Sequence, residues 1–331
     1  MSLRIARGLL TLASAVAAND LHFLVMGDWG GTDHSPWTHT AEVNTAKQMD
    51  KAAASLGAKF SLALGDNFYY KGVTSVDDSR FQNTFEQCFN GDSLKNGHTF
   101  HVIAGNHDHI GNVQAQIDYS KKSSRWSFPS LYYTFSKTAP DGATVQIVMI
   151  DTVKLSGQSS NAEDALRLKG CELPGPANLT AAQSQLQWID ETLAASTADY
   201  VIVAGHYPVY SVGDHGPTSS LSPSKFPYLQ RHKVSAYLCG HDHSEQHIDK
   251  GDGVQYHVIG SANFHSGWDH ISSVSSSQLK YHDNKGTGGY ATVSVNKKGM
   301  VIKHYVGDGT LAYTAPAIPP RGSSGLEGAL V

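Results

Sequence analysis

The chain has 331 residues, of which 40% are hydrophobic and 16% charged, a composition typical of a globular protein with a sizeable core. Its formal net charge of −4 supplies no basic surface for nucleic acid or for an anionic membrane, so we expect neither as a partner. The length allows one large domain or two small ones.

Residues 1–18 have the pattern of a secretory signal peptide. Arg4 and Arg7 give a basic start, residues 9–13 are apolar, and residues 15–18 offer a small-residue cleavage site. A buried or membrane-anchoring helix is the alternative, but the segment is short for a span, and no other stretch is long enough. We therefore expect a protein without a membrane anchor that is secreted or delivered to a lysosome or vacuole.

Five short apolar runs then end in glycine, at residues 23–26, 60–64, 100–104, 200–204 and 236–239. Each run has the length of a strand, and the glycine allows a sharp turn at its end. Every glycine is followed by a potential metal ligand or phosphate contact: Asp28, Asp66, Asn106 with His107, His206, and His241 with His243. A single Gly-Asp pair after a strand is usually just part of a turn, where both residue types are common. Five of them favour a single two-metal site where the carboxyl ends of strands converge.

Helices are expected between the first strands. Residues 41–56 show helical spacing, with Val43, Ala46, Met49 and Ala53 on one face, and residues 78–89 suggest a second helix. This β-α-β-α-β order predicts a mostly parallel sheet with right-handed connections.

The second half predicts further strands and one long helix. Residues 132–136 and 143–150 suggest an antiparallel pair that turns at Asp141-Gly142. Thr180 and Gln183 form a capping box for a helix that runs to about residue 195. Closing strands are expected at 254–259, 290–295 and 300–305, which gives one domain over residues 19–312 with two packed sheets and outer helices.

Two segments lack periodicity. Residues 155–178 form a long polar loop that we expect near the mouth of the site and sensitive to proteases. Residues 313–331 are rich in Pro, Gly and Ser and are expected to be a disordered tail. Asn178-Leu179-Thr180 is a glycosylation sequon.

The three cysteines are too few for a disulfide framework in a domain of this size. A bridge between Cys88 and Cys171 remains open, and Cys239, on an apolar strand, is expected to be a buried free thiol.

The candidate ligands are carboxylate, amide and imidazole groups, which suit Fe, Mn or Zn. Tyr69 lies three residues after Asp66, and it is either a packing residue or a further ligand. Because a phenol titrates near pH 10, a phenolate ligand in an acidic compartment would require a trivalent cation, which indicates Fe(III).

Five blocks of sequence now resemble a known family, the purple acid phosphatases, which are calcineurin-like metallophosphoesterases. The blocks are Gly27-Asp28-Trp29-Gly30-Gly31, Gly65-Asp66-Asn67-Phe68-Tyr69, Gly105-Asn106-His107-Asp108-His109, Gly205-His206-Tyr207-Pro208-Val209 and Gly240-His241-Asp242-His243. Residues 111–117 and 215–218 also resemble its small tartrate-resistant (type 5) branch, and the likeness runs from about Leu21 to Tyr305.

The resemblance implies a four-layer α/β fold with two packed mixed sheets flanked by helices, and a role for each matching residue. Asp28, Tyr69 and His243 would hold Fe(III), Asp66 would bridge the metals, and Asn106, His206 and His241 would hold a divalent ion, Fe(II), Zn or Mn. His107 and His215 would lie near the phosphate without binding metal. Vertebrate members carry a cysteine pair where this chain has Ser156 and Ser220, so a bridge across the long loop is expected to be missing.

The expected reaction is hydrolysis of phosphate monoesters, such as phosphoproteins and nucleotides, with inorganic phosphate as product and inhibitor. Two cations would neutralise the substrate and supply hydroxide, while His107 or His215 would protonate the leaving group. Since histidine is cationic below about pH 6.5, we expect the rate of hydrolysis to be highest in acid. We also expect a monomer. The alternatives are a phosphodiesterase and an exported scaffold protein that lacks catalysis.

Overall fold

The structure is a computed structural model that describes residues 19–159, 173–283 and 287–322. Within these residues the chain forms two seven-stranded mixed sheets with helices outside them, which confirms the expected fold class. The predicted signal peptide and most of the 155–178 loop lie outside the described residues. No helix in the described part of the chain has the length and apolar character needed to cross a membrane.

The strands of the first sheet are, in spatial order, β14 (Leu311–Thr314), β13 (Gly299–Val306), β12 (Gly289–Asn296), β1 (Leu21–Met26), β2 (Phe60–Ala63), β3 (Thr99–Val102) and β4 (Trp126–Ser127). Strands β1 to β4 run parallel, and β12 pairs antiparallel with β1. The second sheet contains β11 (Leu279–Asp283), β9 (Glu245–Asp249), β10 (Gln255–Ile259), β8 (Ala236–Cys239), β7 (Tyr200–Ala204), β6 (Thr144–Met149) and β5 (Tyr133–Thr138). Its central strands β6, β7, β8 and β10 are parallel.

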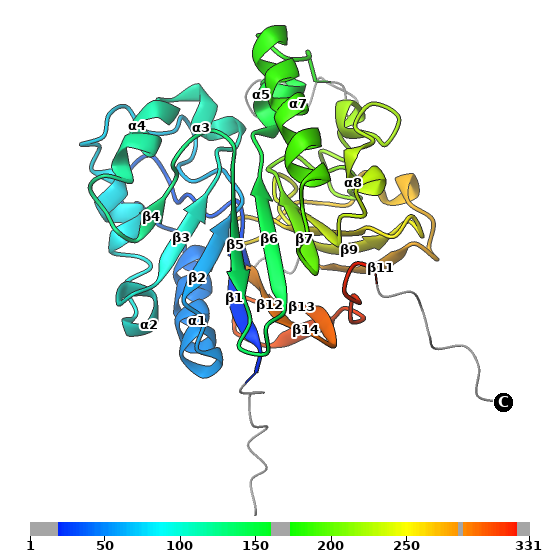
Figure 1. Ribbon diagram of the computed structural model, residues 1–331. Coiled ribbons are helices and arrows are strands. Elements are labelled where there is room, and N and C mark those ends of the chain that lie inside the picture. The colour runs from blue at the N-terminus through cyan, green and yellow to red at the C-terminus, as the bar shows by residue number, and fades with distance from the viewer. Residues whose placement is uncertain (1–18, 160–172, 284–286, 323–331) are drawn as a thin grey trace, which may run out of the picture.

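The helices are α1 (Thr40–Leu56), α2 (Asp92–Lys95), α3 (Asn106–Ile110), α4 (Val113–Tyr119), α5 (Thr152–Ser156), α7 (Leu179–Ala194) and α8 (Tyr228–Arg231). Single turns occur at η1 (Phe81–Glu86), η2 (Ser219–Leu221) and η3 (Ile271–Ser273). Helices α1 and α2 lie beside the first sheet, and α5, α7 and α8 lie on the side of the second (Figure 1).

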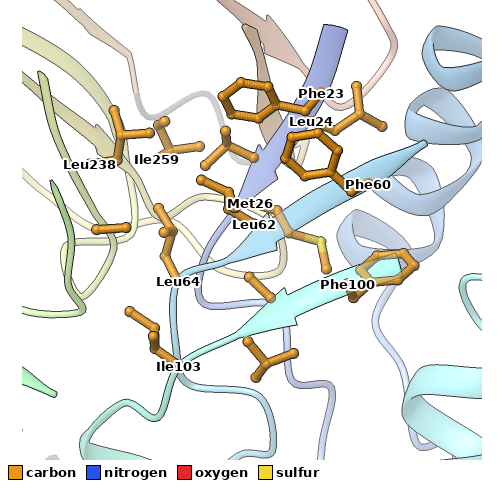
Figure 2. Close-up of a cluster of buried hydrophobic side chains, with 14 of the residues drawn as sticks. Phe23, Leu24, Met26, Phe60, Leu62, Leu64, Phe100, Ile103, Leu238 and Ile259 are labelled. Carbon is orange, nitrogen blue, oxygen red and sulfur yellow. The ribbon is translucent and has the colours of Figure 1, made fainter. Parts of the chain in front are cut away.

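The two faces of the second sheet face different cores, as strand β7 illustrates. Ile202 and Ala204 belong to the large cluster that also contains Phe23 and Leu62 of the first sheet. Val201 and Val203 belong to the cluster under α7 and α8. Because side chains alternate along a strand, a strand buried on both faces has a continuous apolar sequence. Figure 2 shows the core between the sheets, where side chains of β1, β2 and β3 meet Leu238 and Ile259.

Several expected elements are confirmed. Helix α1, the β5–β6 pair with its turn at Asp141-Gly142 and the three closing strands all form near their predicted limits. Strands β4, β9, β11 and β14 were not expected. Cys239 is buried and free, as predicted.

Other expectations were wrong in detail. Val43 is 46% exposed, because α1 turns Glu42, Thr45 and Ala46 inward at that level. The helix expected at 78–89 is a six-residue π-turn, η1. Helix α7 is capped not by Thr180 but by Asn178, whose side chain accepts a hydrogen bond from the Ala181 N–H at 2.9 Å.

Residues 313–322, expected to begin a disordered tail, pack against the fold. Ala315 and Ile318 are buried, and Ile318 pairs with Met300. The Arg321 N–H donates to the Asp199 carbonyl at 2.7 Å. The rest of the expected tail lies outside the described residues.

Ser156 and Ser220, where the resemblance places the cysteine pair of vertebrate members, are in contact. The Ser220 hydroxyl donates to Ser156 Oγ at 2.7 Å. Cys88 forms no disulfide among the described residues, and Cys171 lies outside them, so pairing of these two stays a prediction.

Candidate metal centre

The five glycine-ended strands bring their following residues to one place, at the seam between the sheets. Asp28, Asp66 and Asn106 follow β1, β2 and β3 of the first sheet, while His206 and His241 follow β7 and β8 of the second. One ligand atom from each of Asp28, Asp66 and His206 lies within 4.8 Å of the others. All three side chains are almost completely buried.

The backbone at this seam adopts conformations that ordinary side chains avoid. Asp28, Asp66 and His241 have φ angles of 56°, 51° and 70°. Each such residue costs on the order of 1–3 kcal/mol and persists only where the surroundings enforce it. A Cβ added to Gly105 would lie 2.1 Å from Asp66 Oδ1, so only glycine lets the chain pass that close to the carboxylate.

Three residues gather at one end of the cluster. The Tyr69 hydroxyl lies 3.1 Å from Asp28 Oδ1 and 3.1 Å from His243 Nε2. His243 Nε2 is in turn 3.6 Å from Asp28 Oδ1. These are the three residues for which the family resemblance implies Fe(III) coordination.

His206 presents a lone pair to oxygen atoms at the other end. Its Nδ1 lies 2.9 Å from the Leu64 carbonyl, which can only accept, so Nδ1 carries the proton. Burial lowers the pKa of His206, which favours the neutral ring with Nε2 unprotonated. Nε2 nevertheless faces Asn106 Oδ1 at 2.9 Å and Asp66 Oδ1 at 3.4 Å. Three acceptors in contact fit a cation among them.

His241 continues this end of the cluster. Its backbone N–H donates to Asp28 Oδ2 at 2.8 Å, and its ring centroid lies 5.1 Å from that of His206. The structure therefore brings together all seven residues proposed as ligands, from five separate segments of the chain.

The electrostatics of the cluster also fit cations. Burial, and then the charge of Asp66, raise the pKa of Asp28 well above its usual value. Burial lowers the pKa of His243 to about 3 and that of His241 well below its usual value. Adjacent carboxylates and neutral imidazoles form an electron-donating site that positive charge would stabilise.

His107 and His215 lie at the rim of the cluster and are partly exposed. The backbone N–H of His107 donates to Asp66 Oδ1 at 3.0 Å, and the ring Nδ1 of His107 lies 2.7 Å from the Tyr70 carbonyl oxygen. The His215 ring centroid is 4.1 Å from that of His241. Burial lowers the pKa of His215, but the hydrogen bond to Asp242 and the charge of that carboxylate leave it raised overall.

Further residues next to the cluster hold these groups in place. Asp108, whose pKa burial and Asp66 raise to about 6, accepts from the N–H groups of Asn67 and Gly105 and from Gln116 Nε2. It therefore ties the chain after β2 to that after β3.

A histidine–carboxylate contact links the segment after β3 of the first sheet to the segment after β6 of the second: His109 Nε2 lies 2.7 Å from Asp151 Oδ2. Phe264 packs against His243 and Tyr69, with ring centroids 5.3 and 4.6 Å apart. From the sequence, Asp108 and His109 are expected either to orient the ligands or to face solvent, and both are seen to make hydrogen bonds beside the cluster. Asp151 and Phe264 had no sequence signal.

Comparison with known proteins agrees with this geometry. Residues 21–245 match the family described as Calcineurin-like phosphoesterase. The chain is 43% identical to "Tartrate-resistant acid phosphatase type 5" of Sus scrofa, over 87% of this chain and 84% of that protein. It is 42% identical to the Homo sapiens protein of the same name, over 87% and 88%. "Purple acid phosphatase 4" of Arabidopsis thaliana is 30% identical over 69% and 63%.

Solved structures share the fold. A purple acid phosphatase, PPD1, from Lupinus luteus seeds superposes with a TM-score of 0.62 at 13% identity, over 89% of this chain and 53% of that one. GAP50, described as the anchor in the inner membrane complex of Plasmodium, superposes with a TM-score of 0.74 at 21% identity, over 91% and 89%. On the match over residues 21–245 and the identity to the mammalian proteins, the chain belongs to the calcineurin-like phosphoesterases, within the family of tartrate-resistant and purple acid phosphatases.

Proposed function

We propose that this chain is a binuclear acid phosphatase that hydrolyses phosphate monoesters. The observation that carries the proposal is the meeting of buried carboxylates, an amide and neutral imidazoles at the seam of the two sheets. Family membership implies a binuclear metal centre. The relatives' names, which describe acid phosphatases, support the reaction.

The two ends of the cluster support two metal positions. Asp28, Tyr69 and His243 would hold Fe(III), and Asn106, His206 and His241 would hold Fe(II), Zn or Mn, with Asp66 between them. The contact of the Tyr69 hydroxyl with both Asp28 and His243 supports its inclusion. When bound, two cations neutralise the charge of a phosphate ester and activate water as a nucleophile.

The protein itself supplies orientation and a proton. The His107 ring is oriented by the Tyr70 carbonyl and the His215 ring by Asp242, while the His107 backbone N–H is held by Asp66. Both are partly exposed beside the cluster, where a histidine can donate a proton to the leaving oxygen of an ester.

The wider setting is also proposed. The substrates would be phosphoproteins, nucleotides or small phosphoesters, and inorganic phosphate would inhibit as product. The composition of residues 1–18 supports secretion or delivery to a lysosome or vacuole. We propose a monomer.

The decisive experiment uses colour. A phenolate bound to Fe(III) absorbs visible light, so the purified metal-loaded protein should be violet or pink. Tyr69→Phe should remove the band while the iron content is measured in parallel. The matched control is Tyr133→Phe, because Tyr133 is also buried but donates to the Val102 carbonyl, away from the cluster. A colourless wild type that contains iron and a second metal would exclude Tyr69 as a ligand.

Hydrolysis separates the proposal from its rivals. We expect p-nitrophenyl phosphate to be cleaved faster than bis-p-nitrophenyl phosphate, and the reverse order would indicate a phosphodiesterase. A folded protein with neither metal nor activity would indicate a scaffold.

A further inference from the structure

Residues 211–216 wrap around one buried carboxylate, that of Asp242. Oδ1 accepts from the His215 backbone N–H at 2.7 Å and lies 3.1 Å from His215 Nδ1. Oδ2 accepts from the Gly216 N–H at 3.2 Å and from the Ser211 hydroxyl. The Asp242 side chain is completely buried, so these contacts replace its hydration.

The loop follows the carboxylate so closely that a side chain cannot fit between them. A Cβ on Gly213 would lie 2.5 Å from Asp242 Cγ. Two outer contacts hold the loop in this position: His270 Nδ1 lies 2.8 Å from the Gly213 carbonyl, and Asp214 accepts from the Gly267 N–H at 2.8 Å. The conformation of the loop is therefore built on Asp242.

The geometry also determines which nitrogen of His215 carries its proton in the neutral ring. The Asp242 carboxylate can only accept, so His215 Nδ1 donates to it. Nε2 is then the ring nitrogen with which His215 can reach a ligand. The ring lies beside His241, with 4.1 Å between centroids, at the edge of the proposed metal centre.

We infer that Asp242 is a positioning residue for His215, which holds the imidazole with Nδ1–H on the carboxylate and Nε2 directed to protonate the leaving oxygen of the substrate. This rests on the proposed phosphatase function of the same site. A water oxygen bonds to phosphorus as the ester P–O bond breaks, and the attacking water releases one proton to solvent. The electron pair of the broken bond stays on the leaving oxygen, which takes the Nε2 proton of doubly protonated His215. His215 is then neutral, with Nδ1–H on Asp242, and regains a proton from water after product release.

Asp242→Asn is a sharp perturbation because both carboxylate oxygens act only as acceptors. In either orientation the new amide places an NH₂ group against N–H or O–H donors, so the loop cannot keep all its contacts. The matched control is Asp190→Asn. It alters another Asp–His pair: Asp190 Oδ1 on helix α7 lies 2.6 Å from Nε2 of His232, the residue that follows α8.

The first test needs no metal and no activity. In metal-free, ¹⁵N-histidine-labelled protein, His215→Asn assigns the ring signals. We expect neutral His215 to be the Nδ1–H tautomer in the wild type and in Asp190→Asn, and to lose that tautomer in Asp242→Asn. An Nε2–H tautomer in the wild type would overturn the inference, even if the protein is an active phosphatase.

The second test uses leaving groups of different quality. A lost proton donor matters most for a poor leaving group, so Asp242→Asn should lower kcat for a phosphoserine peptide by about 100-fold and for p-nitrophenyl phosphate by less than about 10-fold. In a double variant with His215→Asn, the Asp242→Asn substitution should cause little further loss of kcat. The positioning role would be refuted if Asp242→Asn lowered kcat equally on both substrates, or if its effect on kcat multiplied with that of His215→Asn in the double variant. Loss of metal from Asp242→Asn with an unchanged His215 tautomer would refute it as well.

Discussion

An engineered disulfide between residues 156 and 220 tests the packing of the loop segment beside the metal centre. The Ser156 and Ser220 oxygens are 2.7 Å apart, and a disulfide joins its sulfur atoms at about 2.05 Å with longer bonds to carbon. Ser156→Cys with Ser220→Cys should therefore close a bridge without moving the backbone. Ser156 ends α5, and Gln158 just beyond it donates to the Asn106 carbonyl at 2.8 Å.

The expected gain follows from the separation of 64 residues along the chain. Loop-closure entropy for that length amounts to about 4 kcal/mol at 25 °C, an upper value because engineered bridges commonly deliver less. For a domain of this size each kcal/mol raises Tm by roughly 2–4 °C, so we expect a rise of about 10 °C in oxidising buffer.

Peptide mapping locates the bridge, and calorimetry with and without reductant measures its effect. Each single cysteine variant is a control for mispairing with the native cysteines, and Ser156→Ala with Ser220→Ala gives the cost of losing the hydrogen bond, about 1 kcal/mol. Alkylation of the new cysteines at 156 and 220 after oxidation, or a Tm rise that survives reduction, would show that these side chains do not face each other as described.

Three further results are expected. Gly105→Ala should reduce metal content and lower kcat/KM by about 100-fold, since its methyl group would displace the Asp66 carboxylate, whereas Gly57→Ala, with nothing within 4 Å of the new methyl, should retain metal by elemental analysis. Burial lowers the pKa of His98 to about 4. Between about pH 6.5 and 4 the unfolded state therefore binds a proton at His98 that the folded state does not bind. The free energy of unfolding should fall across that window by up to roughly 3 kcal/mol from this group, and urea titrations of His98→Gln should show a shallower decline. Inorganic phosphate at 100 times its dissociation constant should stabilise the metal-loaded protein by about 2.7 kcal/mol and leave the metal-free protein unchanged in thermal denaturation.

The sequence predicted the strands that carry the site because those strands are buried on both faces. Val201 to Ala204 read as one apolar run for that reason, and parallel strands end at a common edge. Metal ligands that directly follow such strands can be predicted from the sequence, because the position of each ligand follows from the strand before it.

Strand β9 could not be predicted in the same way. Glu245 and Gln246 read as surface residues but are buried, because their partners come from distant segments: Glu245 Oε2 lies 2.6 Å from His304 Nδ1, and the Gln246 amide donates to Ser211. The prediction that Val43 faces the core was wrong for the converse reason: an apolar residue is exposed because tertiary packing, not residue spacing, sets the rotation of α1 about its axis. The role of Asp242 likewise depends on a loop 27 residues earlier in the chain.

The placement of the metal donors at the seam has a mechanical consequence. Asp28 and Asp66 belong to one sheet and His206 and His241 to the other, so bound cations would cross-link the two halves of the molecule. Sliding of one sheet against the other would stretch coordination bonds before it exposed much of the core. Substitutions deep in the inter-sheet packing can thus alter catalysis without touching a ligand, and loss of metal should loosen the joint between the halves.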